Sequence, residues 1–444
     1  MVEAVNKIEP AAGASGFTAS DNADKLAYED YARCIHCGLC LNHCPTYRLW
    51  GLEADSPRGR IRQMLLVDQG KLELGDSFVR HIDQCLDCRA CETACPSGVE
   101  YGKLVEVARA QIEQNYRRPI FSRLARSLVF CHILPHPQRI AAAARLVRLY
   151  QRSGLQGLAR RSGALRLLGL EQRERLLPMI DREFFFSRLG STFPAQGKRR
   201  ARVAMFAGCV AQVAFSALND ATIRVLTASG CEVVVPNGQV CCGALAAHAG
   251  VRDVARQLAR TNLDAFLGED FDAVVTNAAG CGSTLKEYER LFAPGDAAHE
   301  PARAFQERMR DVTEFLAEIG LVAQLSAVPL RVTYQDSCHL VHGQKIREAP
   351  RKLIRAVPGV ELVEMALADH CCGSAGVYNV TQTEASLALL AEKMHHARAT
   401  GAQAIVTANP GCLLQLRAGA EIHHTGQEVL HVVELLARAI GGPI

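Results

Sequence analysis

Two cysteine runs near the N-terminus constrain this chain more than any other feature. Each run has the spacing C-x2-C-x2-C-x3-C and is followed directly by a proline. The two runs consist of Cys34, Cys37, Cys40 and Cys44, and of Cys85, Cys88, Cys91 and Cys95. This spacing is typical of ligands to [4Fe–4S] clusters, which take one thiolate for each iron.

We therefore predict two [4Fe–4S] clusters with crossed ligands. Three closely spaced cysteines hold three corners of one cubane, and the fourth lies further along the chain, beside the neighbouring cluster. The predicted ligands are Cys34, Cys37, Cys40 and Cys95 for the first cluster, and Cys85, Cys88, Cys91 and Cys44 for the second. Zinc also uses C-x2-C pairs, but two complete runs favour iron–sulfur clusters. Disulfides fit poorly because the cysteines in each run are too close together.

The forty residues between Cys44 and Cys85 predict a helical cluster domain rather than a small hairpin ferredoxin. Ser56-Pro57 has the pattern of a helix N-cap followed by a proline at the first helical position. Apolar residues then recur at helical spacing from Ile61, and Gly70 is typical of a helix stop. We expect residues 27–115 to form an all-helical ferredoxin domain.

Composition and charge narrow the class and the location of the protein. The 444 residues are 49% hydrophobic and 22% charged, as in ordinary globular proteins of several domains, and the net charge of +4 does not favour nucleic-acid binding. We see neither a signal peptide nor an apolar run long enough to cross a bilayer. The sequence thus predicts a cytoplasmic protein whose contact with the inner face of the membrane, if any, is peripheral.

Two segments flank the ferredoxin domain and carry no cysteine motif. Residues 1–26 are expected to be a mobile arm. Residues 116–200 are expected to be an arginine-rich helical linker, since residues 117–200 contain 17 Arg and one Lys against four acidic residues. Two interpretations are open: a linker whose arginines are solvated or paired, and a docking surface for an acidic partner or an anionic membrane face.

The C-terminal half contains an internal repeat with four cysteines in each copy. The modules span residues 201–328 and 329–444, and their cysteines are Cys209, Cys241, Cys242 and Cys281, and Cys338, Cys371, Cys372 and Cys412. Short β-branched runs precede these cysteines and helical stretches lie between them. This pattern predicts two α/β modules, in which buried parallel strands bring four thiols to one crevice.

The repeated cysteines leave several kinds of site open. Zinc, an iron–sulfur cluster, a redox dithiol and simple packing all remain, and an adjacent Cys-Cys pair fits poorly around one ordinary cubane. His339, next to Cys338, is a weak candidate as an additional zinc ligand. Cys131 and Cys231 lie outside every motif, and we predict that both are buried as small apolar side chains.

The order of these motifs resembles that of the iron–sulfur subunit of bacterial glycolate oxidase (glycolate dehydrogenase). The cysteine runs flank the sequence SPRGRI at residues 56–61, and each module combines Cys-Cys-Gly with a later Gly-Cys, at Cys281 and Cys412. The broader family includes iron–sulfur subunits of lactate and anaerobic glycerol-3-phosphate dehydrogenases and the catalytic subunit of heterodisulfide reductase. Modules of the last type end in C-x-x-C, whereas this chain has Thr284 and Gln415 at the final position.

The resemblance implies that this chain is the electron-transfer subunit of a membrane-associated 2-hydroxy-acid dehydrogenase. The isolated subunit is then expected to be inactive. The chain has no dinucleotide or Walker motif, and hydride removal from glycolate requires an organic cofactor such as FAD on a partner flavoprotein. Electrons would then pass through this chain to a quinone. The alternative is a thiol/disulfide enzyme acting at the Cys-Cys-Gly sites. Arg58, Arg60 and Arg89 either raise the cluster potential or lie at the surface without such a role.

Overall fold

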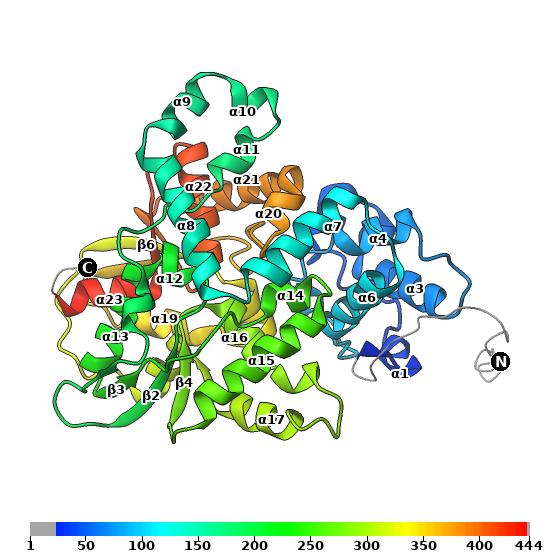
Figure 1. The fold of residues 1–444 in the computed structure, drawn as a ribbon. Helices are drawn as coiled ribbons and strands as arrows, with labels where there is room; N and C mark the ends of the chain where they lie inside the picture. Colours follow the sequence, from blue (N-terminus) through cyan, green and yellow to red (C-terminus); the bar gives the residue numbers. More distant parts are fainter. Residues whose placement is uncertain (1–23, 442–444) are drawn as a thin grey trace.

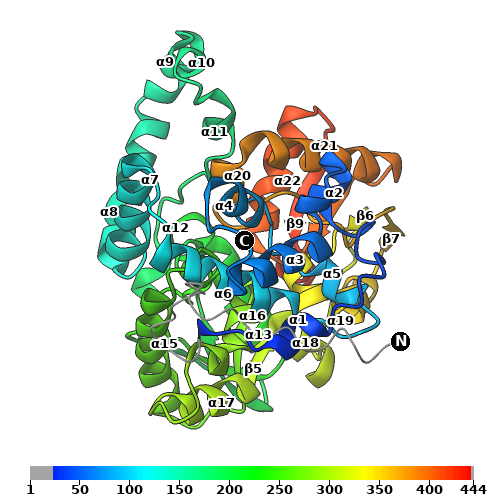
Figure 2. The ribbon, with the colours of Figure 1, turned by 90° about the vertical axis from the view of Figure 1, so that its right-hand side faces the viewer.

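The computed structural model describes residues 24–441. Helices of the N-terminal quarter pack against two α/β modules, and a helical arm projects away from this body (Figures 1 and 2). The expected N-terminal arm lies outside the described residues except for its last three. Of these, Asp24 is buried, and its carboxylate lies 2.5 Å from Arg252 Nε and 2.8 Å from Arg256 Nη2.

Residues 24–115 contain helices and no strand, as the insert between the cysteine runs predicts. Ser56 accepts a hydrogen bond from Gly59 N at 2.9 Å, which confirms the predicted N-cap. Gly70, just beyond the helix that follows, has a positive φ of 65°. The helices are α1 (Tyr28–Ala32), α2 (Pro45–Trp50), the 3-10 turn Glu53–Asp55, α3 (Pro57–Asp68), α4 (Asp76–Asp83), α5 (Ala90–Thr93) and α6 (Tyr101–Asn115).

The linker is helical too, and its middle part forms the projecting arm. Its elements are α7 (Ile120–Arg126), a π-helical segment (Ser127–Ile133), α8 (Pro137–Arg152), α9 (Leu155–Arg161), α10 (Ala164–Leu167), α11 (Glu171–Arg175) and a 3-10 turn (Phe185–Arg188). Cys131 is exposed in the π-helical segment. Our prediction that it is buried was wrong, because the helix turns this residue away from the body.

The first module is built on a five-stranded sheet of order β1-β3-β2-β4-β5. Its strands are parallel except for the edge strand β1, and Cys231 at the start of β3 is buried, as predicted. The strands are β1 (Thr192–Phe193), β2 (Ala201–Phe206), β3 (Cys231–Val234), β4 (Ala273–Thr276) and β5 (Met309–Asp311). The helices are α12 (Ala211–Ala214), α13 (Ser216–Ala228), α14 (Ala244–His248), α15 (Arg252–Leu267), α16 (Ala279–Leu285), the turn Tyr288–Leu291, α17 (His299–Arg308) and α18 (Val312–Ile319).

The second module has a fully parallel sheet of order β7-β6-β8-β9. The two modules therefore confirm the predicted α/β class, but β7 is an edge strand without a fully buried residue, so its prediction as a buried strand was wrong. The strands are β6 (Leu330–Tyr334), β7 (Val360–Glu364), β8 (Ala404–Thr407) and β9 (Glu428–His431). The helical elements are the π-helical turn His339–Gly343, α19 (Glu348–Arg355), α20 (Tyr378–Thr381), α21 (Thr383–Ala399), α22 (Pro410–Ile422) and α23 (Val432–Ile440).

The last helix of each module packs against the other module as well as its own. The helix α18, which ends the first module, packs on α19 of the second, and α23, which ends the second, packs on α13 of the first. Apolar residues of both sheets belong to one continuous core. Because each module covers part of the other, their cysteine loops keep a fixed relation, and Gly280 N reaches Asn409 Oδ1 at 3.2 Å between them.

The ferredoxin domain contacts both modules through charged side chains. Arg89 Nη1 lies 2.9 Å from both carboxylate oxygens of Glu287 in the first module. Arg48 Nη1 donates to His370 Nδ1 of the second module at 2.6 Å. These contacts hold the cysteine runs next to the modules. Among the described residues, no helix has the length and apolar character needed to span a membrane.

Candidate iron–sulfur and thiol sites

Four cysteines drawn from both runs line one cavity, which we call the inner site: Cys44, Cys85, Cys88 and Cys91. The cavity has a volume of about 20 Å³ and is also lined by Pro45, Arg60 and Tyr101. All four cysteines are buried. The fold therefore places the fourth cysteine of the first run beside the first three of the second, in the crossed arrangement that the spacing predicts.

Hydrogen-bond donors surround the sulfur atoms of the inner site. Asp87 N donates to Cys85 Sγ at 3.3 Å, and the Tyr101 hydroxyl donates to the same sulfur at 3.7 Å. Thr46 Oγ1 lies 3.2 Å from Cys44 Sγ. Hydrogen bonds to cluster sulfurs and nearby charge set the reduction potential of iron–sulfur centres, so these residues have the position needed to tune one.

Arg60 places a buried positive charge in the wall of the inner site. Its side chain is 1% exposed and donates to His81 O at 2.6 Å and to Thr46 Oγ1 at 3.0 Å, and it pairs with Asp55 at 3.3 Å. Arg89 is buried as well, between Glu92 and Glu287. A surface location is thus excluded for both residues. Arg58, by contrast, forms a partly exposed pair with Glu53.

The other four cysteines, Cys34, Cys37, Cys40 and Cys95, form the outer site, which is open to solvent. Cys37 is exposed and the other three are partly exposed. Burial raises the pKa of Cys34, a backbone hydrogen bond from His36 opposes the shift, and the nearby Cys95 adds to it. Cys34, Cys40 and Cys95 pack against one apolar cluster, so the end of the second run lies near the first run. Ile35 and Leu39, which flank these cysteines, are 66% and 58% exposed.

The donor set of the inner site fits an iron–sulfur cluster. Four thiols and mainly apolar groups line the cavity, and no carboxylate is among its lining residues. Soft thiolate ligands select iron–sulfur clusters or zinc over hard cations. Burial, with the other cysteine sulfurs nearby, raises the pKa of Cys88 and Cys91, so ligation must release their protons. The assignment of these cysteines as cluster ligands stays a prediction.

The four thiols of the first module converge as expected. Cys209 Sγ and Cys241 Sγ lie 3.4 Å apart, and Cys242 Sγ and Cys281 Sγ lie 3.2 Å apart. Tyr288, whose hydroxyl donates to Cys242 O at 2.8 Å, holds the Cys-Cys backbone in place. The first module thus has two close sulfur pairs beyond the ends of its strands.

The second module brings its four thiols together in a chain of neighbours, with Cys371 next to Cys338, Cys372 next to Cys371, and Cys412 next to Cys372. The adjacent Cys371 thiol and burial raise the pKa of Cys372 to about 12. Asn409 Nδ2 donates to Cys412 Sγ at 3.4 Å. Both modules can therefore offer four sulfur ligands to a metal ion or cluster.

The inner site lies directly against the second module. One apolar cluster contains Leu86, Cys88 and Ala90 from the second run together with Cys371 and Tyr378, and Cys338 packs against it. After burial, the Cys371 thiol is the group that raises the pKa of Cys88 most. The cysteines of the first module are not members of this cluster. The inner site is therefore connected by direct packing to one of the two modules.

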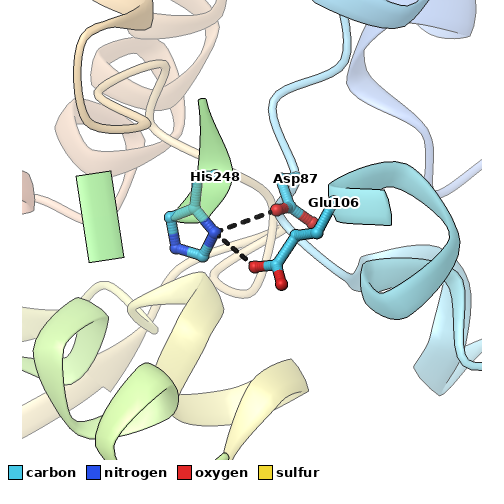
Figure 3. Close-up of side chains that lie close together, drawn as sticks. All are labelled: Asp87, Glu106 and His248. Carbon is cyan, nitrogen blue, oxygen red and sulfur yellow. Dashed lines mark hydrogen bonds and ion pairs between the residues drawn. The ribbon is translucent and has the colours of Figure 1, made fainter. Parts of the chain in front are cut away.

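A buried charged group between the ferredoxin domain and the first module was not predicted from the sequence (Figure 3). His248 Nδ1 lies 2.7 Å from Glu106 Oε1 and 3.2 Å from Asp87 Oδ2. Although burial opposes it, these two carboxylates raise the pKa of His248 to about 10, which favours the imidazolium. The only signal in the sequence is the position of Asp87 inside the Cys85–Cys88 spacer.

His339 takes part in the same contact. Its Nε2 donates to Asp87 O at 2.9 Å, and its ring lies 5.2 Å from that of His248. One ring nitrogen of His339 is thereby engaged with the second cysteine run. This gives the residue a role in joining the domains, and zinc ligation by its other ring nitrogen stays a prediction.

A helical domain with two four-cysteine sites, followed by two thiol-bearing α/β modules, defines the class of iron–sulfur redox proteins. The sequence matches three family descriptions: "4Fe-4S dicluster domain" over residues 30–99, "Glycolate oxidase iron-sulfur subunit, linker region" over residues 121–177, and "Cysteine-rich domain" over residues 203–286 and 332–417. The matches fall on the ferredoxin domain, the arm and the two modules in the order that the structure shows.

The similarity to known proteins identifies the family to which this chain belongs. The probable glycolate oxidase iron-sulfur subunit of Bacillus subtilis (strain 168) is 42% identical, covering 94% of this chain and 96% of that protein. The glycolate oxidase iron-sulfur subunit of Escherichia coli (strain K12) is 30% identical, covering 94% and 97%. Lactate utilization protein A of Oceanobacillus iheyensis is 31% identical and covers 53% of this chain and 96% of its own length. The chain belongs to the family of glycolate oxidase iron–sulfur subunits, which confirms the resemblance noted in the sequence.

Proposed function

We propose that this chain is the electron-transfer subunit of a membrane-associated dehydrogenase that oxidises glycolate. It relays electrons from a partner flavoprotein, through two [4Fe–4S] clusters, toward a quinone-type acceptor. The observation that carries this proposal is the inner site, where four buried thiols from both cysteine runs line one cavity against Cys371 of the second module. Relatives named as glycolate oxidase iron-sulfur subunits support the choice of glycolate.

Each part of the chain has a distinct role in this proposal. When bound, the clusters supply one-electron transfer. The residues of this chain hold them at two depths: the outer site meets solvent, and the inner site lies against the second module. Tyr101 and the Asp87 backbone N–H donate to Cys85 Sγ, and Arg60 provides a fixed positive charge nearby. Hydride removal belongs to a flavin on the partner.

Metal content and cluster spectroscopy test the cluster assignment. The purified chain should contain about eight irons if both ferredoxin sites and nothing else are filled. Cys40→Ser and Cys95→Ser should damage the same cluster in EPR spectra of the reduced protein, because both residues belong to the outer site. If the two substitutions destroy different clusters, the crossed assignment is wrong.

Activity and flavin content test the division of labour. The isolated chain should neither oxidise glycolate nor contain flavin, and a pull-down from native cells should recover a flavoprotein. Stoichiometric FAD in the purified single chain would overturn this part of the proposal. We expect the complex with the partner to oxidise glycolate. Removal of the outer-site or the inner-site cluster should abolish this activity.

We propose further that at least one of the modules binds a metal ion or cluster through its four thiols. Close sulfur pairs in the first module and the row of thiols in the second support this. Cys242→Ser and Cys372→Ser should each remove metal only from their own module and leave the ferredoxin clusters intact. Unchanged zinc and iron content in both variants would show that the modules hold empty thiol pockets.

A further inference from the structure

The projecting arm differs from the rest of the surface in its packing. It consists of α8 to α11; α8 packs on α12 of the body, and α9 and α10 stand away from the body in both views (Figures 1 and 2). Near its end, α9 packs on α8 and α10, and α10 packs on α9 and α11. The helices at the tip are thus covered mainly by one another, and their outward sides face solvent.

The arm and the helix α7 expose an unusual amount of apolar surface. More than half of the large apolar side chains that are exposed on the described residues lie between residues 120 and 179. At the tip, Leu158 is 65% exposed, Leu167 89% and Leu168 68%, and on α8 Leu146 and Leu149 are 69% and 62% exposed. Exposed apolar surface gathered on one segment in this way marks an interaction site.

The charge of the same segment is of one sign. Residues 114–170 contain 11 Arg and not a single Asp or Glu. Some of these arginines are paired, such as Arg160 with Glu174 at 2.8 Å. Arg123, Arg152, Arg161 and Arg166 are exposed and form no ion pair with a carboxylate among the described residues. Exposed leucines are therefore interspersed with unneutralised guanidinium groups.

We propose that this arm docks on the surface of a bilayer that contains anionic phospholipids, with its leucines among the lipid headgroups and its arginines on the phosphates. Helices that lie at a membrane interface combine Leu or Phe with Lys or Arg in this way. The energetic centres of protein interfaces are instead enriched in Trp, Tyr and Arg and poor in Leu. The many exposed leucines, together with charge complementarity to an anionic lipid surface, thus favour a membrane over a protein as the occupant.

The docking surface is connected with the redox core. A groove of about 730 Å³ lies between the last part of the arm and the body, and is lined by Gly169, Gln172 and Arg173 of the arm, by Trp50 of α2 and by Thr383 of α21. Leu49 and Ala385, which also line it, belong to the apolar cluster around Cys88 and Cys371. The proposal rests on the proposed function in one respect: it gives the membrane association of that function a location.

Vesicle binding by the full-length, cluster-loaded chain tests the proposal. We expect the protein to float with phosphatidylcholine vesicles that contain phosphatidylglycerol, and to remain unbound with phosphatidylcholine alone. Salt should weaken the binding, because exposed charges are screened over about 8 Å at physiological ionic strength. Absence of binding to the anionic vesicles, or equal binding to both kinds, would overturn the proposal.

Variants locate the contact on the arm. Leu158→Ser combined with Leu167→Ser removes apolar area without changing the charge, and should lower the vesicle partition coefficient more than tenfold. Val322→Ser is the matched control, since Val322 is 58% exposed outside the arm, and it should leave binding unchanged. Unchanged binding by the double variant, or an equal loss in the control, would refute the assignment to the tip.

Charge variants test the second half of the contact. Arg161→Gln and Arg166→Gln should each lower binding to anionic vesicles about fivefold, as expected for one basic residue near a charged bilayer. Arg331→Gln, on the second module, should have no effect. These variants are exposed, so circular dichroism and iron content should match the unchanged protein.

The readout separates this proposal from the proposed function. Vesicle flotation needs neither glycolate nor a partner. If the protein proves to have no clusters or no electron transfer, the proposed function is refuted and the assignment of the arm to the membrane stands. Conversely, if the leucine variant keeps its vesicle binding but loses the partner flavoprotein in a pull-down, the arm is a protein interface and the membrane proposal is wrong.

Discussion

The outer and inner sites have the same cysteine spacing but opposite surroundings. Cys37 of the outer site is exposed, whereas every cysteine of the inner site is buried. Exposed Ile35 and Leu39 flank the outer cysteines, and Cys371 and Tyr378 of the second module pack against the inner ones. Identical local motifs thus have different environments, because different segments of the chain pack against them.

This difference gives the two sites different roles within the proposed function. An electron donor or acceptor on another protein can approach the outer site directly, while the inner site exchanges electrons through the outer site or through the second module. The cysteines of the first module lie outside that apolar cluster, and charged side chains tie this module to the ferredoxin domain, such as Arg89 with Glu287 and His248 with Glu106. Variants made in pairs, one at each site, test how far this contrast holds.

The largest contrast is expected from removing one cysteine at each site. Cys91→Ser should abolish the inner cluster, lower the iron content by about half and reduce the free energy of unfolding by about 5 kcal/mol, because a buried metal centre at a domain contact is lost. Cys40→Ser should remove as much iron but cost only about 1 kcal/mol, since the cysteines of the outer site are all partly or fully exposed. Iron analysis and urea unfolding check both values, and equal destabilisation would contradict the contrast.

A second pair compares the arginines near the two sites. Arg60→Ala leaves Asp55 buried without its cation and should cost about 3–5 kcal/mol. Arg58→Ala breaks a partly exposed pair with Glu53 and should leave the stability nearly unchanged. Urea unfolding measures both effects.

Redox titration followed by EPR adds an independent readout for the same pair. Loss of the Arg60 charge should lower the reduction potential of the inner cluster and leave that of the outer cluster in place. A potential of the inner cluster that is unchanged in a folded Arg60 variant, such as Arg60→Gln, would show that Arg60 is a structural residue only.

The sequence was sufficient where a pattern is local. The N-cap at Ser56 is fixed by residues within one helical turn, and the parallel strands before Cys209 and Cys338 follow from short β-branched runs. The cysteine spacing predicts that Cys44 lies with the second run, and Cys44 lines the inner cavity with Cys85, Cys88 and Cys91, while its role as a cluster ligand stays a prediction.

Features that depend on contacts between distant segments could not be predicted in this way. The burial of Arg60 results from packing against α4, and the partners of His248 lie in another domain, at Asp87 and Glu106. Cys131 is exposed and β7 is partly exposed because no distant segment of the described chain packs fully over them. Spacing along the chain contains no direct information on such neighbours.

The repeat of the modules provides a third, smaller contrast at the N-caps of α18 and α23. Asp311 accepts from Thr313 N at 2.8 Å, and at the equivalent position His431 Nδ1 accepts from Val433 N at 3.1 Å. Burial raises the pKa of Asp311 to about 6, partly offset by Thr313 and Lys286, and it lowers the pKa of His431 to about 4, with Arg417 acting in the same direction.

The two caps should therefore give opposite dependences of stability on pH. Asp311 has a raised folded-state pKa, so its contribution is present below about pH 4 and is lost as the pH rises through about 6. His431 has a lowered one, so its contribution is present above about pH 6.5 and is lost as the pH falls toward about 4. Relative to the unchanged protein, Asp311→Asn should gain about 1–3 kcal/mol on going from pH 4 to pH 7, and His431→Asn should gain a similar amount in the reverse direction. Urea unfolding at several pH values measures both slopes, and slopes of the same sign would show that the two caps are not the matched, oppositely titrating pair that their positions in the repeat indicate.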